Sequence, residues 1–169
     1  MSESDAFVRL VTAHNRELLR AAWLLTGNWA SAEDLLQTTL TKAWQNWGKV
    51  STADEPLAYV RRILVTTHLK LASRRWRAEL PFAVLPDRPT RDGTAGSDLR
   101  AGLARALAGL PPRQRAVVVL RYLCDLSEAQ TAATLGCSIG TVKGQASRAM
   151  AILRANPALA GLLDVEVSR

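Results

Sequence analysis

Hydrophobic residues recur every three or four positions along most of the chain, which is the spacing of an amphipathic helix. The first such stretch covers residues 7–25, and Gly27 is placed to end it. A second helix is predicted to begin at Ser31, which with Asp34 forms an S-x-x-D capping box, and to bury apolar side chains as far as Trp47. This pattern predicts an all-α fold.

A third helix is predicted after a short break. Residues 48–55 are expected to form a loop, in which Asp54 is a candidate helix cap. Pro56 suits the first position of a helix because its missing amide hydrogen would have no partner there. The apolar stripe that follows predicts a helix over residues 56–77.

Residues 78–98 divide the chain. They include three prolines and two glycines, a composition that rarely forms regular structure. We therefore predict two small helical domains, residues 1–77 and 99–156, joined by a flexible linker and followed by a short tail, residues 157–169. A 21-residue linker could span roughly 70 Å when extended, about two turns of duplex DNA at ~34 Å per turn.

The second half contains the most informative pattern. An apolar stripe over residues 99–110 is interrupted by two prolines, and another helix follows. Residues 126–148 then read LSEAQTAATLGCSIGTVKGQASR, in which Ser127 and Gln130 form a capping box. Gly136 is predicted to make a turn, and Ser138 to cap a helix that runs to about Asn156. Two short helices joined by a tight turn are a helix-turn-helix, whose second helix can enter the major groove of DNA.

Positive charge is concentrated in the same two halves. The net charge is +7, from 22 Lys and Arg against 15 Asp and Glu. Residues 56–77 hold six basic residues and no acidic one, and residues 99–154 hold eight basic and two acidic ones. Two basic blocks favour two sites of contact with phosphates, although a run of charge is also the pattern of a solvated helix face.

Other classes of protein are disfavoured. No apolar run reaches the ~18–20 residues of a membrane helix, and the first ten residues lack the apolar core of a secretion signal, so we expect a cytoplasmic protein. Cys124 and Cys137 have no CxxC partner and no clustered histidines, so reduced thiols are expected and a metal site is not. Walker and Rossmann phosphate loops are absent, and no cofactor or small-molecule substrate is expected.

One enzyme motif does occur. Residues 136–140, GCSIG, match the G-x-S-x-G nucleophile pattern, which requires a strand before the turn. A helix is predicted there instead, and a role as helix cap accounts for Ser138. The chain is therefore expected not to be an enzyme. The remaining alternative is a stand-alone helix-turn-helix regulator, which would leave the helices over 31–47 and 56–77 without a role.

Three segments resemble one family of bacterial proteins. Residues 126–148 are similar to region 4 of RNA polymerase sigma factors of the extracytoplasmic-function (ECF) group. Residues 24–47, LLTGNWASAEDLLQTTLTKAWQNW, resemble sigma region 2, and residues 56–77, PLAYVRRILVTTHLKLASRRWR, resemble the DNA-facing helices that follow it. The resemblance implies a factor that binds core RNA polymerase and promoter DNA, with an anti-sigma factor as a candidate further partner.

The resemblance also assigns roles to residues. Positions matching the polymerase-binding surface are Asp34, Leu35, Gln37, Leu40 and Lys42. Positions matching the surface that captures the −10 element are Arg61, Arg62, Thr66, Lys70, Arg74, Arg75, Trp76 and Arg77. Positions matching the readers of the −35 element are Arg121, Thr141, Lys143, Gly144, Gln145, Ser147 and Arg148.

The chain departs from the family pattern at several of these places. Thr38 stands where relatives usually have Glu, and Thr66 where many have Asn, so neither contact transfers directly. Gly144 and Ser147 replace bulkier residues, so the recognised promoter sequence does not follow from the resemblance.

Three tryptophans and two further arginines are given roles from general physical chemistry. Trp23 and Trp44 are predicted to be core residues, whereas Trp76 fits either a core position or a platform that stacks a base. Arg113 and Arg115 are expected to contact phosphates or solvent.

Overall fold

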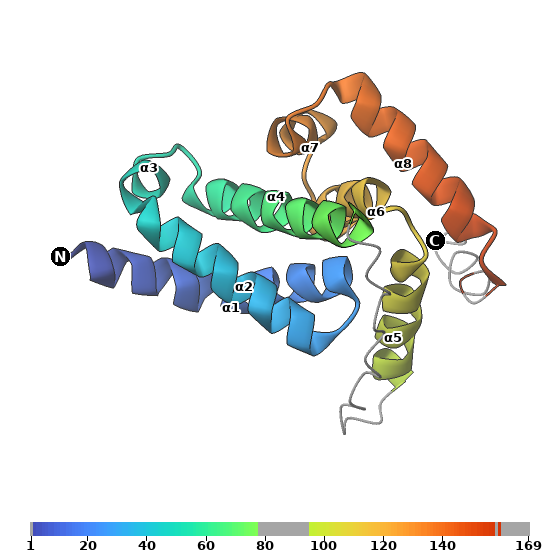
Figure 1. The fold of residues 1–169 in the computed structure, drawn as a ribbon, viewed down its shortest axis with the longest axis horizontal. Helices are drawn as coiled ribbons and strands as arrows, with labels where there is room; N and C mark the ends of the chain where they lie inside the picture. Colours follow the sequence, from blue (N-terminus) through green and yellow to red (C-terminus); the bar gives the residue numbers. More distant parts are fainter. Residues whose placement is uncertain (1, 78–94, 158, 160–169) are drawn as a thin grey trace.

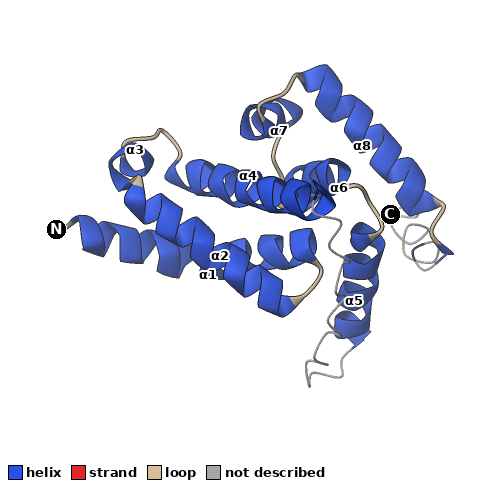
Figure 2. Ribbon diagram, viewed as in Figure 1, coloured by secondary structure: helices blue, strands red, loops and turns tan. Residues whose placement is uncertain are grey.

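Every regular element in the described part of the chain is a helix (Figures 1 and 2). The computed structural model describes residues 2–77, 95–157 and 159, and the all-α prediction is confirmed. The helices, in chain order, are α1 (Glu3–Thr26), α2 (Trp29–Gln45), α3 (Trp47–Ser51), α4 (Pro56–Arg77), α5 (Ala95–Ala108), α6 (Pro112–Val118), the π-helix η1 (Val119–Leu123), α7 (Glu128–Leu135) and α8 (Ile139–Arg154).

The turn between α1 and α2 is made as predicted, but the cap of α2 is not. Gly27 ends α1 with φ 83°, a left-handed conformation that glycine adopts without a Cβ clash, and its amide donates to the Trp23 carbonyl. The prediction that Ser31 caps α2 is wrong, because the helix begins at Trp29 and Asn28 is the cap. Asn28 Oδ1 accepts from the Ser31 amide at 2.8 Å, so an equally good capping residue starts the helix earlier.

The predicted loop over residues 48–55 is partly helical. The short helix α3 occupies its first half, and Trp47 and Val50 on this turn are both buried. Their burial favours a helical turn that the local sequence alone would not hold. Pro56 begins α4, as predicted.

The helix-turn-helix is confirmed in detail. Ser127 and Gln130 form the predicted capping box at the start of α7, with the Gln130 amide donating to Ser127 Oγ at 3.0 Å. Gly136 makes the turn with φ 65°. Ser138 caps α8 by accepting from the Thr141 amide at 3.1 Å.

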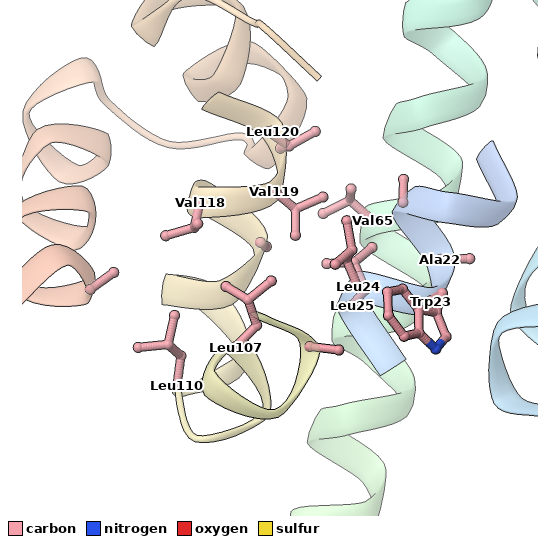
Figure 3. Close-up of a cluster of buried hydrophobic side chains, with 14 of the residues drawn as sticks. Ala22, Trp23, Leu24, Leu25, Val65, Leu107, Leu110, Val118, Val119 and Leu120 are labelled. Atoms are coloured by element: carbon pink, nitrogen blue, oxygen red, sulfur yellow. The ribbon is translucent and has the colours of Figure 1, made fainter. Parts of the chain in front are cut away.

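The main hydrophobic core joins the two halves of the chain. It contains side chains from α1, α2 and α4 and, after residue 95, from α5, α6, η1 and α8, with Leu135 of α7 packed against it. Figure 3 shows Leu25, Val65, Leu107 and Val119 in this cluster. The two predicted domains therefore pack against each other through one shared core. Helix α5 begins at Ala95, inside the predicted linker; residues 78–94 and most of the tail lie outside the described residues.

A second core lies within the first half and explains the tryptophans there. Trp47 is buried in it, and Phe7 packs against both Trp47 and Trp44, with ring centroids 5.3 and 5.1 Å away. Trp44 was predicted to be a core residue, and this is wrong, since 45% of it is exposed. Trp47, the last residue of the predicted apolar stripe, is buried as predicted, and it lies on α3. The prediction for Trp23 is confirmed: it is buried and stacks on Trp29.

Candidate nucleic-acid interface

Three basic side chains of α4, Arg62, Lys70 and Arg74, lie four or eight positions apart along one side of the helix, and all three are exposed. Arg75 is also exposed but lies on the side of His68, whose pKa its charge lowers. No carboxylate of the described residues pairs with any of the four. Thr66 is half-buried, and its hydroxyl donates to the Arg62 carbonyl at 2.7 Å. The side chains of Trp76 and Arg77 lie outside the described residues. The exposed cations form a surface suited to the phosphates of one strand.

Arg61 lies apart from this face, although it was predicted with it. Its Nε donates to Glu17 Oε1 at 2.9 Å, and a second nitrogen of the guanidinium contacts the same oxygen. The pair joins α4 to α1, and His14 lies 3.7 Å from the same carboxylate. Arg61 is therefore already neutralised, and a phosphate would have to compete with Glu17 for it.

The second exposed basic face belongs to α8. Thr141, Lys143, Ser147 and Arg148 are exposed, whereas Gly144 and Gln145 are half-buried. Lys143 Nζ lies 3.7 Å from Glu128, a loose pair between α8 and α7. Beside them is an open cavity of about 310 Å³ lined by Tyr122, Glu128, Lys143, Ala146, Ser147, Met150 and Arg154. Residues 141–148 of α8 thus present hydrogen-bond donors and positive charge to solvent.

Arg121, predicted as a reader of the −35 element, has a structural contact here. Its guanidinium donates to the Leu126 carbonyl and lies 5.7 Å from the ring centroid of Tyr122. This contact spans the turn before α7, where Asp125 has φ 53°. The structure therefore assigns Arg121 to holding that turn, and a base contact would require its release.

The predicted polymerase-binding positions on α2 separate into exposed and buried ones. Asp34 and Gln37 are exposed, as is Thr38. Leu35 is only 2% exposed and packs in the main core, so the expectation that it contacts a partner is not supported. Leu40 is half-buried against the second core. Lys42 is also half-buried, and its Nζ donates to Thr67 Oγ1 of α4 at 3.1 Å.

Arg115 is the largest departure from expectation. It was expected to meet phosphates or solvent, but it is buried and its guanidinium donates to four backbone carbonyls. These belong to Leu25 (2.7 Å), Leu107 (2.8 Å), Ala108 (3.0 Å) and Leu110 (3.0 Å). Burial lowers the pKa of Arg115. The sequence held one signal for this: Arg115 is three and four positions before the buried residues Val118 and Val119, on the apolar side of the helix.

His68 is a second buried ionisable group that the sequence analysis missed. It lies four positions after the core residue Leu64, and its Nε2 has no hydrogen-bond partner among the described residues. Burial, and then the positive charges of Arg115 and Arg75, lower its pKa from 6.5 to about 4. His68 is therefore neutral at pH 7 and belongs to the junction between the halves.

The described residues give little support to other chemistry. The Ser138 hydroxyl is engaged as a helix cap between two helices, without the strand that a nucleophile elbow requires. No cluster of three or more metal-binding side chains occurs among residues 2–77 and 95–157. Burial raises the pKa of the Cys124 thiol, as expected of a packing residue. Within the same ranges, no helix is both long enough and apolar enough to span a bilayer.

Comparison with known proteins places both halves of the chain. Residues 10–78 match the family model of Sigma-70 region 2, and residues 100–153 match that of Sigma-70, region 4. The RNA polymerase sigma-E factor of Streptomyces coelicolor is 38% identical over 154 residues, which cover 91% of this chain and 87% of that protein. ECF RNA polymerase sigma factor SigM of Mycobacterium tuberculosis is 36% identical, over 88% of this chain and 75% of that protein.

Solved structures agree with these matches. The sigma factor RpoE of Bartonella quintana, in complex with the anti-sigma factor NepR, superposes with a TM-score of 0.70 at 27% identity and covers 88% of this chain and 94% of that one. CnrH, in complex with the cytosolic domain of CnrY, gives 0.65 at 26% identity and covers 96% and 90%. The chain belongs to the extracytoplasmic-function group of bacterial RNA polymerase sigma factors.

Proposed function

We propose that this sigma factor binds core RNA polymerase through the exposed face of α2, the −10 element through α4, and the −35 element through α8. The observation that carries the proposal is that region 2 and region 4 occur in one chain, each with its own exposed basic helix face. A stand-alone regulator would need only the helix-turn-helix, so it leaves the region 2 match and the basic face of α4 unexplained.

The chain's part in initiation is binding, and we assign bond-making to the polymerase. Opening the duplex costs about 1.4 kcal/mol per base-pair step. Arginines on α4 can hold the phosphates of one separated strand, and each base that stacks on an aromatic side chain returns ~1–3 kcal/mol. Trp76 is the candidate platform. The proposal includes a cytoplasmic location, where polymerase and chromosome meet.

For the polymerase surface we retain Asp34, Gln37, Leu40 and Lys42, and leave out the buried Leu35. For the −35 element we retain Thr141, Lys143, Gly144, Gln145, Ser147 and Arg148, which lie between positions 141 and 148 of α8. The neighbouring structure of RpoE with the anti-sigma factor NepR supports a further partner of the anti-sigma class for this chain.

Two substitutions should separate the two binding functions. Arg148→Ala removes an exposed cation from α8 and is expected to weaken binding of the assembled holoenzyme to promoter duplex by about 1–3 kcal/mol. Asp34→Ala removes an exposed carboxylate from α2 and is expected to weaken association with core polymerase while leaving the DNA contacts in place. Fluorescence anisotropy of labelled promoter and of labelled sigma factor measures the two affinities, on a promoter selected from a genomic library by run-off transcription.

Two control substitutions remove an exposed side chain of the same charge outside the proposed binding faces. Arg16→Ala removes an exposed arginine of α1, and Glu33→Ala removes the exposed carboxylate next to Asp34. Both controls are expected to bind like the unmodified protein. Exchanged phenotypes, with Arg148→Ala impaired only in core binding and Asp34→Ala only in DNA binding, would overturn the assignment of faces.

A further inference from the structure

Lys143, one of the positions proposed to contact the −35 element, is held by a carboxylate of the neighbouring helix. Its Nζ lies 3.7 Å from Oε2 of Glu128, which is in the first turn of α7. Figure 1 shows the short turn that joins α7 to α8 and brings the two helices together. The two side chains are 63% and 38% exposed, and a pair as exposed as this adds little to the stability of a fold.

The start of α7 does not depend on Glu128 either. Ser127 and Gln130 form the complete capping box of this helix, with each side chain accepting from the backbone amide of the other. Among the described residues, Lys143 is the basic side chain that pairs with Glu128. The contact of Glu128 with Lys143 is therefore the feature that calls for a function.

The pair is open to a ligand of α8. Glu128 and Lys143 both line the open cavity of about 310 Å³, and Ser147, another position proposed to contact the −35 element, lines it beside them. A carboxylate thus lies on the surface that is proposed to face a polyanion. By charge alone Glu128 weakens the binding of that surface to any DNA.

The two kinds of DNA acceptor affect this pair differently. A lysine ammonium has three donors, so Lys143 can donate to Glu128 and to a second acceptor at once. The acceptors on a base edge, such as O6 and N7 of guanine, are uncharged and leave the pair undisturbed. A phosphate is an anion, and a lysine that bridges it to Glu128 would hold two negative charges about 6 Å apart.

We propose that Glu128 is a specificity-determining residue of the helix-turn-helix: by holding Lys143 it penalises the contact of this lysine with phosphate and leaves its contact with a base edge unpenalised. The proposal rests on the −35-binding role given above and deepens it. A repulsive element that acts against the wrong partner raises specificity at some loss of affinity.

Glu128→Gln removes the charge and keeps the shape of the side chain. Binding of the assembled holoenzyme is compared on two duplexes, the selected promoter and the same sequence with its upstream element scrambled, by fluorescence anisotropy at low ionic strength. We expect affinity for the scrambled duplex to rise about threefold, the repulsion of two unit charges 6 Å apart in water. Affinity for the promoter should change much less, so discrimination between the duplexes falls about threefold.

Asp125→Asn is the matched control. Asp125 is an exposed carboxylate three positions before Glu128, and no described basic side chain pairs with it. Its φ of 53° is one that asparagine also adopts. This substitution removes the same charge from the same end of α7, so the affinities for the two duplexes should move together. Unchanged discrimination in Glu128→Gln, or an equal fall in Asp125→Asn, would overturn the proposal.

Lys143→Ala shows whether the effect passes through the lysine. In that background Glu128→Gln should leave discrimination unchanged, because no ammonium remains to bridge the carboxylate and a phosphate. A threefold fall that persists without Lys143 would contradict the mechanism. Circular dichroism checks that each variant keeps its helical content.

Raising the salt concentration separates this mechanism from a change in the structure of α7. Salt screens exposed charges, so the difference in discrimination between Glu128→Gln and the unmodified protein should shrink as salt is added. A difference that does not depend on salt would count against the mechanism. If the unmodified holoenzyme binds both duplexes equally, the proposed −35-binding role fails instead, whatever Glu128→Gln shows.

Discussion

Replacing Leu107 with alanine is expected to lower the free energy of unfolding by about 2–5 kcal/mol, the usual range for a leucine removed from a packed core. Leu107 is 0% exposed and lies where α5 meets the end of α1. The cavity left behind would be bordered by side chains of both halves, so the loss falls on the junction. Urea unfolding followed by circular dichroism measures it.

The matched control is Leu71→Ala on α4, the same change at a side chain that is 40% exposed. This substitution should lower the free energy of unfolding far less than Leu107→Ala, because a surface position leaves no closed cavity. The number of unfolding transitions also tests whether the two regions share a core. If they do, the unmodified protein unfolds in one transition, and Leu107→Ala shifts the whole of that transition. Two transitions, of which Leu107→Ala shifts only one, would contradict the shared core.

Acid should destabilise the protein through His68. Its pKa is lowered to about 4 in the fold, against 6.5 for an ordinary histidine. Above pH 6.5 the side chain is neutral in both states, so no penalty arises. Between pH 6.5 and 4 the unfolded chain binds a proton that the folded chain does not, so stability falls by about 1.4 kcal/mol per pH unit, and by about 3 kcal/mol in all.

His68→Leu isolates this contribution. Nε2 of His68 has no hydrogen-bond partner among the described residues, so an apolar side chain of similar size should be tolerated at pH 7. The variant is expected to lose much less stability than the unmodified protein between pH 6.5 and 4. His14→Leu, which replaces the other histidine, should keep the steep loss. The explanation fails if His68→Leu and the unmodified protein follow the same pH curve.

Local sequence chemistry was sufficient for the helix-turn-helix. Ser127, Gly136 and Ser138 act through hydrogen bonds and backbone angles within four residues of themselves, so their roles can be read without knowing the rest of the fold. The same reasoning misplaced the start of α2, because Asn28 and Ser31 are both good caps and the sequence offers no local way to choose between them.

Contacts across the chain were not predictable in this way. Arg115 and Leu25 are 90 positions apart, and only the packing of region 4 on region 2 brings them together. The charge of Arg115 favoured a solvent-exposed position, and its apolar neighbours were the weaker signal. The exposure of Trp44 has a similar cause, since Phe7 packs against the rings of both Trp44 and Trp47 and the fold decides which of the two is covered.

The binding faces lie between these cases. The exposed arginines of α4 and the exposed residues of α8 follow from helical spacing, and the structure places them where a helix with one buried side must. The contacts of Arg61, Arg121 and Leu35 do not follow from helical spacing. Arg61 donates to Glu17, and Arg121 donates to the Leu126 carbonyl. Leu35 packs in the main core. Sequence position identified the helix in each case, but not the partner of the side chain.

We infer that this chain gives core polymerase its promoter specificity. Run-off transcription with purified core polymerase, on promoters selected from a genomic library, is the decisive measurement. We expect a discrete transcript when core polymerase and the chain are present together, and none with either alone. Tight binding of the free chain to duplex DNA, with no transcript when core polymerase is added, would contradict it.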